Sequence, residues 1–175
     1  MNICGYQKTT LLDYPGHVAA TIFTGGCNFR CPFCHNSDLV TSLTISDSIP
    51  EEEIFTFLKR RKNVLSGICI TGGEPTLQAD LAEFIEKVRS FGYKIKLDTN
   101  GYRPEVIAAL LAKNLLDYIA MDIKTGHSNY IKVSGFPNLN MENIKKSISL
   151  IENAGIPYEF RTTVVKELHS EKDFL

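Results

Sequence analysis

Short runs of apolar and β-branched residues alternate along the chain with longer segments of helical period. The short runs cover residues 17–24, 67–71, 93–99, 117–123 and 157–165, and we expect them to be strands. The longer segments cover residues 51–63, 77–92, 103–114 and 141–155, and we expect them to be helices. A further helix is expected to begin at Glu171. This order of elements predicts parallel strands joined by helical crossovers, in an α/β fold.

Two architectures satisfy this order, an open doubly wound sheet and an incomplete barrel. Gly92 and Gly155 fall where helix C-caps belong, and Pro50 and Pro104 lie near helix starts. Most of the motifs that carry chemistry lie at or just after the C-terminal end of a strand, the edge at which both architectures bind ligands. Without a linker or repeat to divide them, residues 1–175 are expected to form a single domain.

The composition of the chain excludes few classes of protein, but it bears on where in the cell we expect to find the protein. Lys and Arg number 19 and Asp and Glu number 20, so the formal charge of −1 gives no general attraction to nucleic acid or to an anionic membrane. The first ten residues lack the pattern of a signal peptide, and no apolar run reaches the roughly 18–20 residues that span a bilayer. We therefore expect a cytoplasmic protein with neither a nucleic-acid nor a membrane partner.

Five cysteines, three of them within eight residues, indicate a metal site rather than a disulfide framework. Cys27, Cys31 and Cys34 have C-x3-C-x2-C spacing in a loop that follows the first predicted strand. Thiolates select zinc, Cu(I) or iron–sulfur clusters, and three thiolates on a four-iron cluster leave one iron open to a substrate. The alternative is a structural zinc site closed by His35 or by Cys4. Cys69 lies in an apolar run and is expected to be buried.

Three other strand ends carry polar motifs that have ordinary explanations when taken singly. In Gly72-Gly73-Glu74 the glycines allow close backbone approach to a ligand, and the carboxylate can accept hydrogen bonds from an ammonium. The segment 98–101 reads as a turn, and Asp122 with Lys124 reads as an exposed ion pair. Arg161, in the last predicted strand, reads as a salt bridge at the rim of the sheet.

Residues 13–36, DYPGHVAATIFTGGCNFRCPFCHN, resemble the radical S-adenosylmethionine (SAM) superfamily and, within it, the activases of glycyl-radical enzymes. The likeness runs from about Leu12 to about Val165. Among the activases, the sequence is similar in particular to the anaerobic ribonucleoside-triphosphate reductase activating proteins. It implies a partial (βα) barrel that holds one [4Fe-4S] cluster on Cys27, Cys31 and Cys34. It also implies that Phe33 lies near the adenine of SAM.

The same resemblance assigns the polar strand ends to the SAM pocket. Gly72, Gly73 and Glu74 correspond to the site of the methionine ammonium, with Glu74 as its charge partner. Asp98 and Thr99 correspond to a pocket motif in which the aspartate, with Asp122, helps to form a monovalent cation site. Lys124 approaches the methionine carboxylate, and Arg161 is a candidate ligand contact. His17 is expected to be structural or to face the substrate, and the turn at residues 13–16 is expected to help form the substrate entrance. His127 and His169 are expected in solvent.

The resemblance implies reductive cleavage of SAM to a 5'-deoxyadenosyl radical, which removes an α-hydrogen from a glycine of a partner enzyme. Flavodoxin or ferredoxin would supply the electron. Two alternatives remain: a radical SAM enzyme for a small molecule, such as a deazapurine synthase, and a non-catalytic zinc or electron-transfer module. The sequence shows no candidate for the sixth strand and last helix that the resemblance implies after the fifth predicted strand, so we expect either a truncated chain or an unusually open barrel, and favour truncation.

Overall fold

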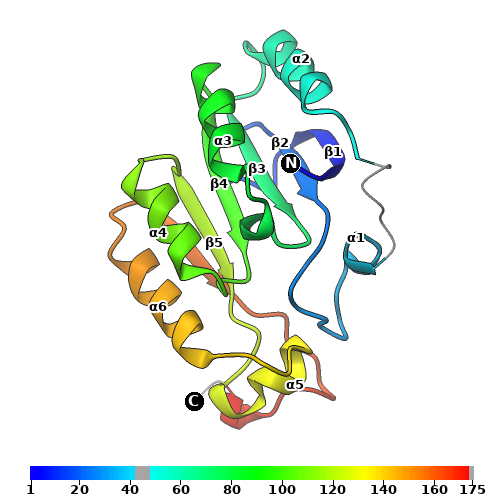
Figure 1. The fold of residues 1–175 in the computed structure, drawn as a ribbon, viewed down its shortest axis with the longest axis vertical. Coiled ribbons are helices and arrows are strands. Elements are labelled where there is room, and N and C mark those ends of the chain that lie inside the picture. The colour runs from blue at the N-terminus through cyan, green and yellow to red at the C-terminus, as the bar shows by residue number, and fades with distance from the viewer. Residues whose placement is uncertain (42–47, 174–175) are drawn as a thin grey trace.

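The computed structural model describes residues 1–41 and 48–173, which contain one six-stranded sheet in the order β1-β2-β3-β4-β5-β6 (Figure 1). The strands are β1 (Ile3–Thr10), β2 (Ala19–Thr24), β3 (Gly67–Gly72), β4 (Lys94–Thr99), β5 (Tyr118–Asp122) and β6 (Tyr158–Arg161). β1 pairs antiparallel with β2, and every later neighbour pairs in parallel. The fold is α/β with a mostly parallel sheet, as the alternation of elements predicts.

Helices connect the parallel strands. They are α1 (Ser37–Thr41), α2 (Glu51–Arg61), α3 (Leu81–Ser90), α4 (Pro104–Ala112), α5 (Tyr130–Ser134) and α6 (Met141–Glu152), with short 3-10 turns η2 (Pro75–Leu77), η3 (His127–Asn129) and η4 (Glu171–Asp173). All five predicted strands and all four predicted helices are present, with shifted ends. The last predicted strand is too long by four residues, since β6 ends at Arg161. β1, α1 and α5 were not predicted, and the helix expected from Glu171 is a single 3-10 turn as far as Asp173.

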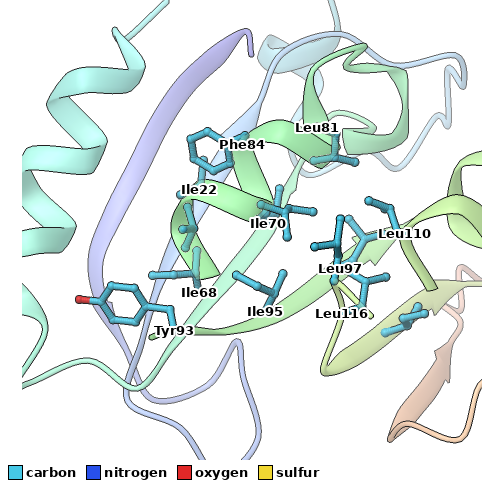
Figure 2. Close-up of a cluster of buried hydrophobic side chains, with 14 of the residues drawn as sticks. Ile22, Ile68, Ile70, Leu81, Phe84, Tyr93, Ile95, Leu97, Leu110 and Leu116 are labelled. Atoms are coloured by element: carbon cyan, nitrogen blue, oxygen red, sulfur yellow. The ribbon is translucent and has the colours of Figure 1, made fainter. Parts of the chain in front are cut away.

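One face of the sheet packs against helices through a continuous apolar cluster. Ile68 and Ile70 of β3 and Ile95 and Leu97 of β4 are fully buried there, and Phe84 of α3 packs on them (Figure 2). Fully burying an aliphatic side chain of this size stabilises a fold by about 1.5–3 kcal/mol. The cluster is therefore what fixes the strand ends relative to one another.

The opposite face of the sheet is polar, because successive side chains of a strand point to opposite sides. Lys96 alternates with Ile95 and Leu97 along β4, and it lies in register with Cys69 of β3. Cys69 is buried, as expected, but it lies outside the apolar cluster and faces Lys96 and Asp98. Burial raises its pKa well above the ordinary value for a thiol.

The turn at residues 13–16 lies at the N-terminal edge of the sheet, because it immediately precedes β2. There the rings of Tyr14 and His17 are in tilted contact with centroids 4.4 Å apart, and His17 Nδ1 lies 2.9 Å from Ser66 Oγ. The cysteine loop follows the other end of β2. The turn and His17 therefore lie away from the cysteine loop. The contacts of His17 with Tyr14 and Ser66 agree with a structural role, and the turn expected to help form the substrate entrance does not border that loop.

Over the described parts of the chain, no helix has the length and apolar character that crossing a membrane requires.

Candidate cofactor site

A cavity of about 440 Å³ lies at the C-terminal edge of the parallel strands. Every residue that the sequence nominated for the site lines it: Cys27, Cys31, Phe33, Cys34, Gly72, Gly73, Glu74, Asp98, Thr99, Asp122, Lys124 and Arg161. These residues come from the ends of β2, β3, β4, β5 and β6, which the parallel topology brings to one edge of the sheet. The structure thus brings the nominated residues together, while their individual roles stay predictions.

The cysteine loop is held in place by a distant part of the chain. The Arg30 amide donates to Ser134 O at 2.8 Å, and the Cys31 thiol donates to the same carbonyl at 3.8 Å. Gly135 has φ +61°, and a Cβ there would lie 2.3 Å from Arg30 O. Only glycine fits this close approach. The C-terminal end of α5 therefore forms one support of the loop.

The three thiols of the loop are free and partly buried. Burial raises the pKa of Cys27 to about 11, against a hydrogen bond from the Phe29 amide that favours the thiolate. Burial also raises the pKa of Cys31, while Lys124 opposes the rise. Without a metal Cys27 and Cys31 are therefore thiols at neutral pH, and a metal that binds them displaces their protons.

The donor set fits a four-iron cluster better than a single zinc ion. A tetrahedral zinc site with bonds of about 2.3 Å needs sulfur atoms roughly 3.8 Å apart. Among residues 1–41 and 48–173, no three Cys, His, Asp or Glu side chains converge closely enough to hold one ion. His35 lines the cavity, but the Cys4 thiol lies against Gly25 and Asn2 instead. Thiolates that each bind a different iron of a cluster lie further apart than zinc ligands, so this arrangement is compatible with a cluster.

Asn100 approaches the cysteine loop from the end of β4, a contact that the sequence did not reveal. Its side-chain amide donates to Asn28 Oδ1 at 2.8 Å and lies 3.8 Å from Cys27 Sγ. The Phe29 amide also donates to Cys27 Sγ, at 3.3 Å. The sequence indicated a turn at residues 98–101. The contact of Asn100 with the cysteine loop depends on the sheet order, in which only β3 separates β4 from β2.

Glu74 is 1% exposed and accepts four hydrogen bonds from the chain itself. Oε1 accepts from Thr76 N at 3.1 Å, Thr76 Oγ1 at 2.6 Å and Thr99 Oγ1 at 2.7 Å. Oε2 accepts from Asn100 N at 2.7 Å. Burial raises the pKa of Glu74, although these donors favour the ionised form. The carboxylate thus joins the end of β3 to the end of β4, whatever it contributes to a ligand.

The two glycines before Glu74 serve a contact within the chain. A Cβ on Gly73 would lie 2.0 Å from Gly26 O, and Gly72 has φ +116° with Thr24 N 2.3 Å from an added Cβ. The Glu74 amide donates to Gly26 O at 2.8 Å. The sequence predicted that the glycines admit a ligand, whereas the close approach seen here is to the backbone that leads into the cysteine loop.

The remaining polar residues form an ionic network across β4, β5 and β6. Arg161 Nε donates to Asp122 Oδ1 at 3.0 Å, and Arg161 NH1 donates to Asp98 Oδ2 at 3.1 Å. Lys124 Nζ donates to Asp122 Oδ2 at 2.9 Å, and Lys96 Nζ donates to Asp98 Oδ1. Burial opposes the charge of Arg161, but Asp98 and Asp122 hold its pKa above the ordinary value.

Lys96 is a site-proximal residue that the sequence analysis missed. Its side chain is 1% exposed, and its ammonium also lies 3.6 Å from Glu159. A lysine in a strand is normally expected to be exposed to solvent. Lys96 has buried partners because it lies on the polar face of the sheet, opposite the apolar cluster. His169 was likewise expected in solvent, but its Nε2 lies 2.8 Å from Lys124 O and its ring lies 6.3 Å from the Phe33 ring.

Residues 21–174 match the sequence profile of the Radical SAM superfamily, so the chain belongs to that superfamily. Its members use a [4Fe-4S] cluster and SAM, which agrees with the thiols and polar groups gathered in the cavity. The family prediction made from residues 13–36 is therefore confirmed.

The chain is 35% identical, over 98% of its length, to a protein of Methanocaldococcus jannaschii named "Putative glycyl-radical enzyme activating enzyme". It is 26% identical, over 83% of its length, to a protein of Thermococcus kodakarensis named "Probable GTP 3',8-cyclase". The chain spans 71% of the first relative and 47% of the second. Among solved structures it is similar to Streptococcus suis SuiB, with a TM-score of 0.65 and 18% identity over 86% of this chain and 33% of that chain. The last likeness supports the fold alone.

Proposed function

We propose that the chain is a glycyl-radical-enzyme activase whose protein substrate is an anaerobic ribonucleoside-triphosphate reductase. The observation that carries the proposal is the cavity itself, in which three thiols of one loop face polar groups from four other strand ends. The activase reading is further supported by the relative from M. jannaschii, whose similarity covers 98% of this chain.

In this proposal Cys27, Cys31 and Cys34 would hold the cluster. When bound there, the cluster and SAM would supply the radical chemistry by which an α-hydrogen is removed from a glycine of the partner. The chain's own residues bind and orient. Lys124 offers its ammonium to the methionine carboxylate, and Phe33 offers an apolar surface to the adenine.

The protein also has to keep water from the reacting atoms. The part of the cavity lined by Glu74 and Thr99 is suited to this because both side chains are buried. Glu74 and Thr99 are 1% and 3% exposed, and the hydrogen bond between them joins the ends of β3 and β4. A reactive species formed in front of them meets packed chain rather than solvent on this side. A low-potential protein such as flavodoxin or ferredoxin would donate the electron.

A second candidate is a radical SAM enzyme that acts on a small molecule, which the similarity to the T. kodakarensis protein named as a GTP cyclase favours. Both candidates share the cofactor site and differ in what meets the radical. The source of the hydrogen that ends on 5'-deoxyadenosine separates them.

The test is anaerobic reconstitution of the full chain with iron and sulfide, reduction with dithionite and assay of 5'-deoxyadenosine from SAM. Cys31→Ser is expected to abolish product, while Cys69→Ser, which alters a thiol outside the cavity lining, retains it. The partner reductase is then prepared with α-deuterated glycine. Transfer of deuterium to 5'-deoxyadenosine, with a glycyl radical signal on the reductase, is the expected result.

Product without deuterium transfer from the reductase would contradict the activase proposal and favour a small-molecule substrate. Stoichiometric zinc with no uptake of a cluster would contradict both enzyme candidates.

A further inference from the structure

Arg161 lies between the two aspartates that the sequence analysis nominated for a monovalent cation. Arg161 and Asp122 are register partners on neighbouring parallel strands, β6 and β5. The guanidinium donates through Nε to Asp122 Oδ1 at 3.0 Å and through NH1 to Asp98 Oδ2 at 3.1 Å. One planar group therefore bridges both carboxylates.

The remaining oxygens of the two carboxylates are occupied as well. Asp98 Oδ1 accepts from the buried Lys96 ammonium, and Asp122 Oδ2 accepts from Lys124 at 2.9 Å. Each of the four oxygens thus already faces a cationic side chain. Alkali metal ions bind to oxygen ligands, and here a metal ion would have to displace a guanidinium or an ammonium to reach one.

The charge balance of the group argues in the same direction. Lys96, Lys124 and Arg161 contribute three positive charges. Asp98, Asp122 and Glu159, which lies 3.8 Å from Arg161 NH1, contribute three negative charges. An added metal ion would leave the network with one excess positive charge, which repels the buried ammonium of Lys96 as well as the other two cationic side chains.

We infer that Arg161 supplies the positive charge between Asp98 and Asp122, so that this cavity binds no alkali metal ion there. The cation expected from the family resemblance is thus replaced by a side chain of the protein. Arg161 is by this account a positioning residue: it fixes Asp122, and Asp122 fixes the ammonium of Lys124. The inference rests on the geometry of the network and does not depend on the proposed reaction.

The experiment compares melting temperatures in potassium chloride, sodium chloride and choline chloride at equal ionic strength. It uses the full chain after anaerobic reconstitution, and the cofactor-free chain alongside, so that a failure to load the cluster leaves the cation result readable. The unsubstituted chain is expected to melt within about 1 °C in the three salts. Saturable stabilisation by potassium or sodium would overturn the inference.

The informative variant is Arg161→Gln, which removes the charge and keeps a polar side chain. It is expected to gain a selective response, with a melting temperature about 3 °C higher in potassium or sodium chloride than in choline chloride. The matched control is Arg103→Gln, which removes an exposed ion pair to Glu105 and should show no selectivity. If Arg161→Gln also shows none, the guanidinium is not standing in for a metal ion and the inference fails.

A second measurement is independent of whether the variant folds. Titration of the unsubstituted chain with sodium, followed by the line width of the sodium-23 resonance, reports a bound ion directly. A saturable broadening would overturn the inference, and its absence is the expected result.

Discussion

Replacing Glu74 by glutamine tests whether the buried carboxylate joins the ends of β3 and β4. Glu74→Gln keeps the shape of the side chain but exchanges one acceptor oxygen for an amide donor. The glutamine side chain keeps the most hydrogen bonds when its oxygen takes the position of Oε1, where three donors converge. Its amide nitrogen then faces the Asn100 amide, whose donor is 2.7 Å from Oε2 in the unsubstituted chain.

The size of the effect follows from these contacts. Losing a hydrogen bond to a charged acceptor costs about 1.5–3 kcal/mol, and leaving a buried donor without a partner costs about 1–3 kcal/mol. Burial raises the pKa of Glu74, so the neutral amide avoids part of a desolvation cost that the carboxylate bears. We expect a net loss of about 2–4 kcal/mol in the free energy of unfolding, which lowers the melting temperature by about 5–15 °C.

The assay is denaturant and thermal unfolding of the full chain under identical conditions. The matched control is Glu105→Gln, because Glu105 is exposed and has one ion-pair partner, Arg103. Its effect is expected to stay below about 0.5 kcal/mol. A double-mutant cycle with Thr99→Val measures how much of the 2.7 Å contact depends on the charge of the carboxylate, because the glutamine oxygen still accepts from Thr99 Oγ1, and a coupling below about 1 kcal/mol is expected.

A Glu74→Gln variant as stable as the unsubstituted chain would refute the reasoning. If that variant also bound SAM weakly, the carboxylate would act on the ligand, as the sequence predicted, and not as a link between strands.

Three further predictions follow from single contacts. Gly73→Ala should destabilise the chain by about 3 kcal/mol because its Cβ meets backbone at 2.0 Å, whereas Gly5→Ala, with no atom near its Cβ, should be neutral in the same unfolding assay. Asn100→Leu removes an amide donor beside Cys27 Sγ and should lower the reduction potential of the cluster by roughly tens of millivolts, measured by redox titration followed by electron paramagnetic resonance. Asp117 is partly buried, which opposes its charge, but its basic partners hold its pKa below 3.8. The stability it contributes is therefore present above pH 3.8 and is lost as pH falls through the lower, folded-state pKa; Asp117→Asn should remove that part of the acid dependence.

The sequence predicted the parallel part of the sheet well because each strand there carries a compact apolar signal. It missed β1, whose residues Ile3–Thr10 mix apolar, polar and glycine positions without alternation. The register of β1 against β2 shifts twice, between Ile3 and Gly5 and between Gln7 and Thr10. Such irregular edge strands are specified by pairing with a neighbour, and their own residues show no period to detect.

The sequence also predicted which residues would meet at the cavity, because parallel strands place their C-terminal ends at one edge. It could not predict which partner each polar group would have. Arg161 shows why, because its partners Asp98 and Asp122 lie on other strands and far away along the chain. Lys96 pairs with Asp98 two positions along its own strand and with Glu159 of β6, but its burial depends on which face of the sheet it occupies. The supports of the cysteine loop at Ser134 and Gly135 lie more than 100 residues from Cys31, and no local pattern marks them.

The contact between the cysteine loop and the end of α5 also orders events during synthesis of the chain. Cys27, Cys31 and Cys34 emerge early from the ribosome, but Ser134 and Gly135 emerge about 100 residues later, after five of the six strands. Until then the loop lacks the carbonyl that holds Arg30 and Cys31. We therefore expect stable binding of a metal cluster only after most of the sheet has been synthesised. A chain arrested before Gly135 would contain the three cysteines but lack the backbone of α5 that supports their loop.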